Sequence, residues 1–151
     1  KVTIIGNGRL VGTPLSVLMQ KRGAHVTVCT HTTRDFAHRV RNADIVVSAT
    51  GVPGLVTKNM VHENQVIIDA GTSSENGTIQ GDVIFDDIAP FVHALSPTPG
   101  GVGPITVVEL LNNVVKAARM NAHTESDVTS PQRTKNHSVS GPFIKRIHSL
   151  L

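Results

Sequence analysis

The stretch VTIIGNGRLVG at residues 2–12 decides the fold class. Its first four residues are β-branched and predict a buried strand. Three glycines follow, and then Leu15, Leu18 and Met19 recur at helical spacing until Gly23. A strand, a glycine-rich turn and a helix in this order are the context that a dinucleotide-binding fingerprint requires.

The three glycines of this turn have separate expected roles. Gly6 permits a tight turn, Gly8 lets the backbone approach a pyrophosphate, and Gly12 lets the helix pack close to the strand. The N-terminus of the helix then favours the anion through its free N–H groups and its dipole. The alternative, a glycine-rich turn without a ligand, is disfavoured by the strands and helices that surround it.

Further apolar runs continue the pattern at residues 26–29, 45–48 and 66–68. Short helices are expected between them, the first carrying Phe36 and Val40 and capped by Thr33 or Asp35. Because these runs are continuously apolar rather than alternating, helices should cover both faces of the sheet. The sequence therefore predicts an α/β fold, a Rossmann-type doubly wound and mostly parallel sheet with helices on both faces.

The second half of the chain carries weaker signals. Residues 75–78 contain an Asn-Gly pair and predict a hairpin, residues 91–95 a further strand, and residues 105–119 a helix with one broad apolar side. From residue 121 the composition turns polar. We predict an NAD(P)-binding Rossmann domain at residues 1–120 and a polar, disordered tail at residues 121–151, in which any short helix after residue 143 should fray.

The end of the second predicted strand bears on the choice of cofactor. An acidic residue there would accept hydrogen bonds from the adenosine ribose and repel a 2′-phosphate. Residues 29–34 read CTHTTR, and no carboxylate appears before Asp35. NADP is therefore the expected cofactor, with NAD as the alternative. For individual residues the alternative is that Thr33 only caps a helix and His31 is only solvated.

A second loop, PTPGGVGP at residues 97–104, is unusual for a simple connection. Its prolines make the entry and exit rigid, and its three glycines expose backbone donors before the last predicted helix. Such a loop can hold a flat polar ring system through main-chain hydrogen bonds.

Composition argues against several classes of protein. With 3% aromatic residues, no Trp and no Tyr, there is no stacking surface for single-stranded nucleic acid, and no dense basic stripe for a duplex. Cys29 has no disulfide partner, no apolar run reaches the length of a membrane span, and the eight histidines show no metal-ligand spacing. Asp69 and Asp82 have the chemistry of acid/base groups, but an Asp after a buried strand more often binds the local turn.

Together these motifs resemble the cofactor-binding domain of the bifunctional methylenetetrahydrofolate dehydrogenase/methenyltetrahydrofolate cyclohydrolase family. The resemblance runs from Lys1 to about Arg119. It rests on six segments, of which the last is the most specific: residues 5–14, 26–29, 43–54, 66–71, 81–83 and 97–104.

The resemblance implies two groups of binding residues. The family's cofactor loop falls on Gly6, Asn7 and Gly8, with further contacts at His31 and Thr72. Its folate-contacting loop falls on Pro99, Gly100, Gly101, Val102 and Gly103. Where the family usually has Gly-Arg-Ser, this chain has Gly6-Asn7-Gly8, and His31 replaces a frequent serine. The usual Arg and Ser help to hold the 2′-phosphate, so Arg9, Arg34 or protonated His31 would have to compensate.

The function that the resemblance implies is oxidation of 5,10-methylenetetrahydrofolate to the methenyl form with NADP, followed by hydrolysis to 10-formyltetrahydrofolate. The family's catalytic Lys and Tyr belong to an N-terminal domain that this chain lacks, so no catalytic residue is expected here and the chain alone should be inactive. The expected partners are a tetrahydrofolate substrate, that missing domain and a second copy in a homodimer; neither nucleic acid nor a membrane is expected. The cytoplasm is the predicted compartment, with the mitochondrion as the alternative.

Two other functions stay open on the sequence. One is a degenerate dinucleotide-binding module without catalysis, which Asn7 and Gly8 favour. The other is the cofactor half of a different two-domain dehydrogenase, against which the loop at residues 97–104 argues.

Overall fold

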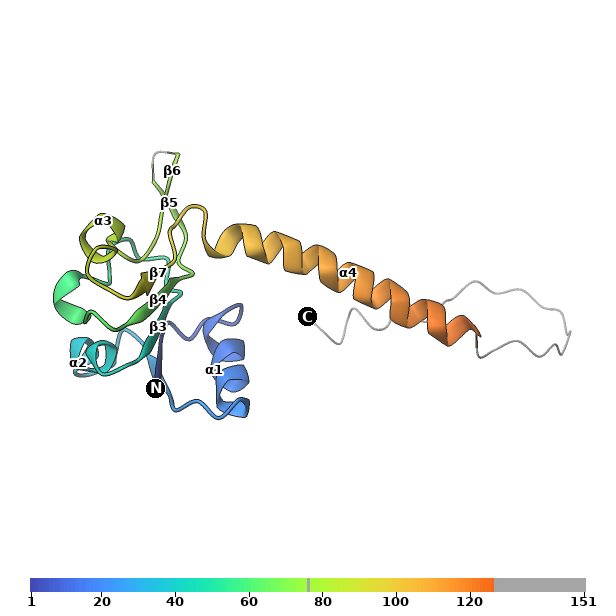
Figure 1. Ribbon diagram of the computed structural model, residues 1–151, viewed down its shortest axis with the longest axis horizontal. Coiled ribbons are helices and arrows are strands. Elements are labelled where there is room, and N and C mark those ends of the chain that lie inside the picture. The colour runs from blue at the N-terminus through green and yellow to red at the C-terminus, as the bar shows by residue number, and fades with distance from the viewer. Residues whose placement is uncertain (76, 127–151) are drawn as a thin grey trace, which may run out of the picture. The chain divides into compact units, whose positions relative to one another are not determined.

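The computed structural model describes residues 1–75 and 77–126 of the chain (Figure 1). These residues belong to two compact units, the first comprising Lys1–Asn113 and the second beginning at Val114. The first unit contains a five-stranded sheet in the order β2-β1-β3-β4-β7. Its strands are β1 (Val2–Ile5), β2 (Val26–Cys29), β3 (Ile45–Ser48), β4 (Val66–Asp69) and β7 (Ala94–Leu95).

All four strand pairings in this sheet are parallel. Val2 of β1 lies opposite Val26 of β2 on one side and Ile45 of β3 on the other, so β1 has a hydrogen-bonded strand on each side. β1 and β3 lie where the strand order reverses, and in open α/β sheets ligands bind in the crevice outside the carboxyl ends of strands at such a point. The predicted Rossmann-type, mostly parallel sheet is confirmed.

Helices cover both faces of the sheet (Figure 1). On one face, α1 (Gly12–Lys21) packs Leu15 and Met19 against Ile4 and Val47. On the other, α2 (Phe36–Arg41), the 3₁₀ turn η1 (Lys58–Met60) and α3 (Phe85–Ile88) enclose a core of buried residues. Its members come from the sheet and from the helices and connections on this face: Ile5, Val40, Ala43, Val46, Val56, Val61, Ile67, Val83 and Ile88.

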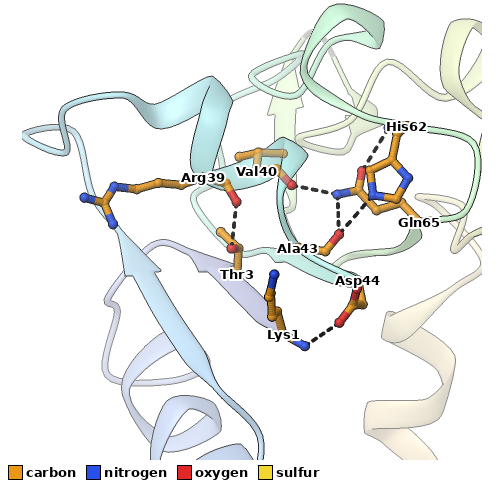
Figure 2. A network of polar contacts seen from close by, with 8 residues as sticks. All are labelled: Lys1, Thr3, Arg39, Val40, Ala43, Asp44, His62 and Gln65. Atoms are coloured by element: carbon orange, nitrogen blue, oxygen red, sulfur yellow. Dashed lines mark hydrogen bonds and ion pairs between the residues drawn. The ribbon is translucent and has the colours of Figure 1, made fainter.

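The C-terminal end of α2 is held by polar contacts at the amino-terminal edge of the sheet (Figure 2). Gln65 is fully buried, and its Nε2 donates to the carbonyls of Val40 at 2.6 Å and Ala43 at 2.8 Å. Its Oε1 accepts from the His62 N–H at 3.2 Å, and Thr3 Oγ1 donates to the Arg39 carbonyl at 3.0 Å. The bonds to the Arg39 and Val40 carbonyls satisfy groups that the end of a helix leaves without helical partners.

Several local predictions differ from the structure. α2 begins at Phe36, but neither Thr33 nor Asp35 caps it, because Asp35 adopts a left-handed conformation (φ 55°) and makes no capping bond. β7 is confined to Ala94–Leu95, and α3 was not predicted. The hairpin at residues 75–78 forms from β5 (Ser73–Glu75) and β6 (Thr78–Gln80), while Asn76 lies outside the described residues.

The last helix, α4 (Val102–Ser126), is longer than expected at both ends. It begins inside the predicted loop, and it continues past residue 121, so the prediction of a disordered tail is wrong for residues 121–126; residues 127–151 lie outside the described part. Its apolar side chains are exposed, including Ile105 (65%) and Leu111 (62%). An apolar helix face in water is the kind of surface that marks an interaction site.

Within residues 1–75 and 77–126, no cluster of three His, Cys, Asp or Glu side chains is arranged to hold a metal ion. In the same ranges, no helix combines the length and apolar character needed to cross a membrane.

Candidate functional site

A cavity of about 770 Å³ opens at the carboxyl ends of β1, β2 and β3. It lies at the reversal of strand order, and its volume is within the range of roughly 300–1,000 Å³ typical of ligand sites. Its walls are formed by three turns, one after each strand, and by neighbouring side chains. The lining residues are Ile5, Gly6, Asn7, Gly8, Cys29, Thr30, His31, Thr33, Phe36, Ala49, Thr50, Val52 and Leu55. The structure thus brings together four of the predicted site residues, Gly6, Asn7, Gly8 and His31.

The first turn follows β1 and has the steric properties expected of its glycines. Gly6 has φ 101°, and a Cβ there would lie 2.6 Å from the Ala49 carbonyl oxygen. A Cβ on Gly12 would lie 2.0 Å from the Gly6 carbonyl oxygen, so α1 packs against the turn only because this position is glycine. A Cβ on Gly8 would meet nothing within 4 Å. The space beside Gly8 is therefore open for a ligand.

The side chain of Asn7 ties this turn to the start of α1. Its Oδ1 accepts a hydrogen bond from Thr13 Oγ1 at 3.0 Å, and the Thr13 N–H donates to the Gly8 carbonyl at 3.0 Å. The turn is thus held in place by hydrogen bonds within the chain.

The second turn follows β2 and is closed by reciprocal hydrogen bonds. The Thr30 N–H donates to Thr33 Oγ1 at 2.8 Å, and the Thr33 N–H donates to the Thr30 carbonyl at 3.0 Å. The two other side chains of the turn, those of His31 and Thr32, are exposed, and His31 lines the cavity. Thr33 thus closes this turn rather than capping α2.

No Asp or Glu belongs to the cavity lining among the residues that the structure describes. Asp35, the first acid after β2, lines a separate groove of about 440 Å³ together with Lys1, His25 and Arg39. The described lining of the cavity therefore carries no carboxylate that would contact and repel a ribose 2′-phosphate.

Cys29 forms part of the cavity floor at the end of β2. Its side chain is fully buried, and burial raises the pKa of the thiol, an effect that the positive charge of Arg39 partly offsets. The thiol is therefore a neutral, apolar part of the wall.

The third turn follows β3 and is bound by a residue far away in the sequence, Asp82. One oxygen of its carboxylate, Oδ2, accepts from the Thr50 N–H at 2.7 Å, from Thr50 Oγ1 at 2.8 Å and from Ser48 Oγ at 2.6 Å. Reasoning from sequence missed this role. The only signal was the segment at residues 81–83 within the family resemblance, which gives no indication of what Asp82 contacts.

Asp69, at the end of β4, binds its local turn as predicted and extends the same polar cluster. Its Oδ1 accepts from the N–H groups of Gly71 at 3.0 Å and Asp82 at 3.2 Å, and its Oδ2 from Val83 N–H at 3.1 Å. Burial raises the pKa of the Asp69 carboxyl, these backbone bonds oppose the rise, and the nearby Asp82 charge adds to it.

The other predicted residues lie outside the cavity lining. Thr72 is exposed, and its carbonyl oxygen lies 3.5 Å from where a Cβ on Gly51 would be, so it adjoins the third turn. The segment at residues 99–103 follows β7, and α4 already begins at Val102 within it. The residue before this segment, Thr98, is joined to β4, because its Oγ1 donates to the Asp69 carbonyl at 3.4 Å.

Comparisons with known proteins agree on one family. A family model described as the NAD(P)-binding domain of tetrahydrofolate dehydrogenase/cyclohydrolase matches residues 1–122. The bifunctional protein FolD of Staphylococcus aureus (strain bovine RF122 / ET3-1) is 44% identical over 124 residues, which are 82% of this chain and 43% of that protein. The chain thus spans less than half the length of the curated relatives it matches.

Solved structures give the same result. The bifunctional 5,10-methylenetetrahydrofolate dehydrogenase/cyclohydrolase of Thermoplasma acidophilum superposes with a TM-score of 0.76 at 42% identity, over 81% of this chain and 44% of that one. The Trypanosoma brucei dehydrogenase-cyclohydrolase, solved in complex with NADP and an inhibitor, has a TM-score of 0.75 at 38% identity, over 80% of this chain and 44% of that one.

Proposed function

Because this chain belongs to the tetrahydrofolate dehydrogenase/cyclohydrolase family, matching its NAD(P)-binding domain, we propose that it binds NADP for an enzyme that oxidises 5,10-methylenetetrahydrofolate to 5,10-methenyltetrahydrofolate and hydrolyses that product to 10-formyltetrahydrofolate. The observation that carries the proposal is the cavity at the carboxyl ends of β1–β3, with its glycine turn and no carboxylate in its lining among the described residues. NADP, when bound, accepts the hydride.

The residues of this chain would bind and orient the dinucleotide. The turn at Gly6–Gly8 would hold the pyrophosphate through main-chain N–H groups at the start of α1, in the open space beside Gly8. His31 would face the adenosine ribose and its 2′-phosphate, and Thr72 would contact the cofactor beyond the third turn. The segment at residues 99–103 would contact the folate with its main chain.

The remainder of the enzyme would cover surfaces that this chain leaves open. On the α1 face of the sheet, Val26, Ile45 and Ile68 are only half-buried. The apolar side chains of α4 are exposed as well. Since the relatives are about twice as long, we propose that the missing catalytic domain packs on such apolar surfaces. The homodimer that the family resemblance implies is proposed as well.

Calorimetric titration of the chain with NADP and with NAD tests the proposal. We expect saturable binding of NADP and weaker binding of NAD. If neither dinucleotide binds, the chain is a degenerate module that keeps the fold without the ligand. If NAD binds much more tightly than NADP, the absence of a carboxylate does not determine the cofactor.

A further inference from the structure

Asp82 is a buried carboxylate that lies behind the cavity rather than in it. It follows β6, and its side chain is fully buried. Oδ2 accepts three hydrogen bonds, while Oδ1 has no hydrogen-bond partner among the described residues. Burying a carboxylate costs folding free energy unless its oxygens accept hydrogen bonds. The burial of Asp82 therefore indicates a role beyond stability.

All three donors lie at the end of β3 or in the turn that follows it. Two of them belong to Thr50, which lines the cavity, and the third is the hydroxyl of Ser48 directly below it. Thr50 Oγ1 in turn accepts from the Val52 N–H at 3.2 Å. The carboxylate therefore binds the turn from Ser48 to Val52 at its middle residue, Thr50.

This turn lies close to the glycine turn, which also lines the cavity. A Cβ on Gly6 would lie 2.6 Å from the Ala49 carbonyl oxygen and 3.3 Å from Thr50 Cγ2. Because the space between the two turns is too small even for a methyl group on Gly6, a shift of Thr50 would change the surface that faces the glycine turn.

Asp82 is itself held with little freedom. Its N–H donates to Asp69 Oδ1, and its carbonyl accepts from the Val56 N–H at 3.0 Å. A Cβ on Gly71 would lie 2.0 Å from Asp82 Oδ1, so the carboxylate fills the space beside that glycine. A group held this firmly can transmit its position to the turn that it binds.

We propose that Asp82 is a positioning residue for the dinucleotide: its carboxylate holds the Ser48–Val52 turn in the orientation that shapes the cofactor cavity. The inference rests on the proposed function for the identity of the ligand. It needs no contact between Asp82 and the cofactor.

The test compares Asp82→Ala and Asp82→Asn with a matched control, Gln65→Ala. Gln65 is also a fully buried polar residue with several hydrogen bonds, but it lies at the opposite edge of the sheet and holds α2 (Figure 2). Both alanine variants should lower the melting temperature. Only the Asp82 variants should alter the cavity.

Two measurements separate positioning from stability, both made well below the melting temperature of each variant. The first is amide hydrogen exchange at Thr50 and Val52, which should accelerate by about tenfold or more in Asp82→Ala and remain unchanged in Gln65→Ala. The second is the Kd for NADP, which should rise by roughly tenfold or more in Asp82→Ala, the equivalent of one hydrogen bond to a charged group. Asp82→Asn keeps the shape and one acceptor oxygen, so it should fall between the parent and Asp82→Ala; if Asp82→Ala does not fold, this variant decides the test.

Each outcome bears on the inference. If the Asp82 variants match Gln65→Ala in both measurements, Asp82 is only structural and the inference is wrong. If exchange accelerates while the Kd for NADP is unchanged, the turn is held by Asp82 but does not shape the site, which also overturns it. If the parent chain binds no NADP, the proposed function fails and the dinucleotide role fails with it, whereas the exchange rates still decide whether Asp82 positions the turn.

Discussion

The glycines of the first turn differ in what a side chain would do to the molecule. Gly8→Val should leave the fold intact, because a Cβ there meets no atom within 4 Å, and it should abolish measurable dinucleotide binding by filling the space for the pyrophosphate. Gly6→Ala should instead lower stability, because the residue has φ 101° and the new Cβ would lie 2.6 Å from the Ala49 carbonyl oxygen. Circular dichroism and calorimetry distinguish the two. If Gly8→Val binds as tightly as the parent, the pyrophosphate does not lie at this turn.

The choice between NADP and NAD should respond to charge at Asn7. Asn7→Arg places a guanidinium on the cavity wall, and a charge-assisted hydrogen bond to the 2′-phosphate is worth about 1.5–3 kcal/mol, so the preference for NADP should rise roughly tenfold or more. Asn64→Arg adds the same charge at an exposed position outside the cavity lining and should leave the preference unchanged. The ratio of the two Kd values measures the effect. An equal rise in affinity for both cofactors would mean that the new charge contacts only the pyrophosphate.

Cys29 should report on the cavity through its reactivity. Because burial raises the pKa of this thiol, a smaller fraction of it is thiolate at a mildly alkaline pH than of a free thiol. A thiol-reactive label should therefore modify Cys29 more slowly than glutathione, by about tenfold or more. The rate should keep rising with pH beyond the range where glutathione levels off. NADP should slow it further, because the thiol lies in the cavity floor. Labelling at the glutathione rate, or without any effect of NADP, would contradict this geometry.

At the scale of single residues, reasoning from sequence succeeded where the constraint was local. The roles of Gly6 and Gly12 follow from a turn and a helix that adjoin them in the chain, and the structure confirms both. The role of Asp82 could not be predicted, because its donors, Ser48 and Thr50, are more than thirty positions away. A buried carboxylate also has no sequence pattern that distinguishes it from an exposed turn residue.

Among the elements, β1, β2, β3 and β4 were predictable because each begins with at least three consecutive β-branched residues, without the alternation of polar and apolar positions typical of a sheet with one face in water. α3 has four residues, too few for a helical period to appear, and was missed. The cap of α2 was predicted from residue type alone. Thr33 instead closes the turn after β2, so competition between two local hydrogen bonds decided the outcome.

Substitutions in β4 and α4 should have opposite consequences for stability. Ile67 is fully buried in the central sheet, so Ile67→Ala should cost about 2–5 kcal/mol in free energy of unfolding. Leu111 on α4 is 62% exposed, and Leu111→Ala should change the stability of this chain by less than about 0.5 kcal/mol. Chemical denaturation measures both. A large loss for Leu111→Ala would show that the helix face is covered in this chain in solution.

At the scale of the whole molecule, the surroundings and the C-terminal end of α4 could not be predicted from the sequence. Its apolar side was predicted, and an apolar side normally implies packing on the core. Within the first unit, Ile105 and Leu111 are exposed, so the pattern specifies a contact that the residues described in this unit do not make. The C-terminal end of α4 was predicted too early, because the polar composition after residue 121 does not prevent the helix from continuing to Ser126.

The chain alone should bind NADP without catalysing its reduction. The cavity provides a glycine turn and hydroxyl groups, but the chain contains no Tyr, and no Lys lines the cavity among the described residues, so the Lys and Tyr that the family resemblance implies for acid/base chemistry are not in this cavity. Mixing the chain with NADP and 5,10-methylenetetrahydrofolate should give no ultraviolet absorbance of reduced nicotinamide above that of the mixture without protein. A full-length dehydrogenase/cyclohydrolase of the family is the positive control, and its activity should persist when the chain is added. Robust reduction of NADP by the chain alone would mean that residues of this chain supply the acid/base chemistry. It would contradict the proposal that cofactor binding and catalysis belong to different halves of the enzyme.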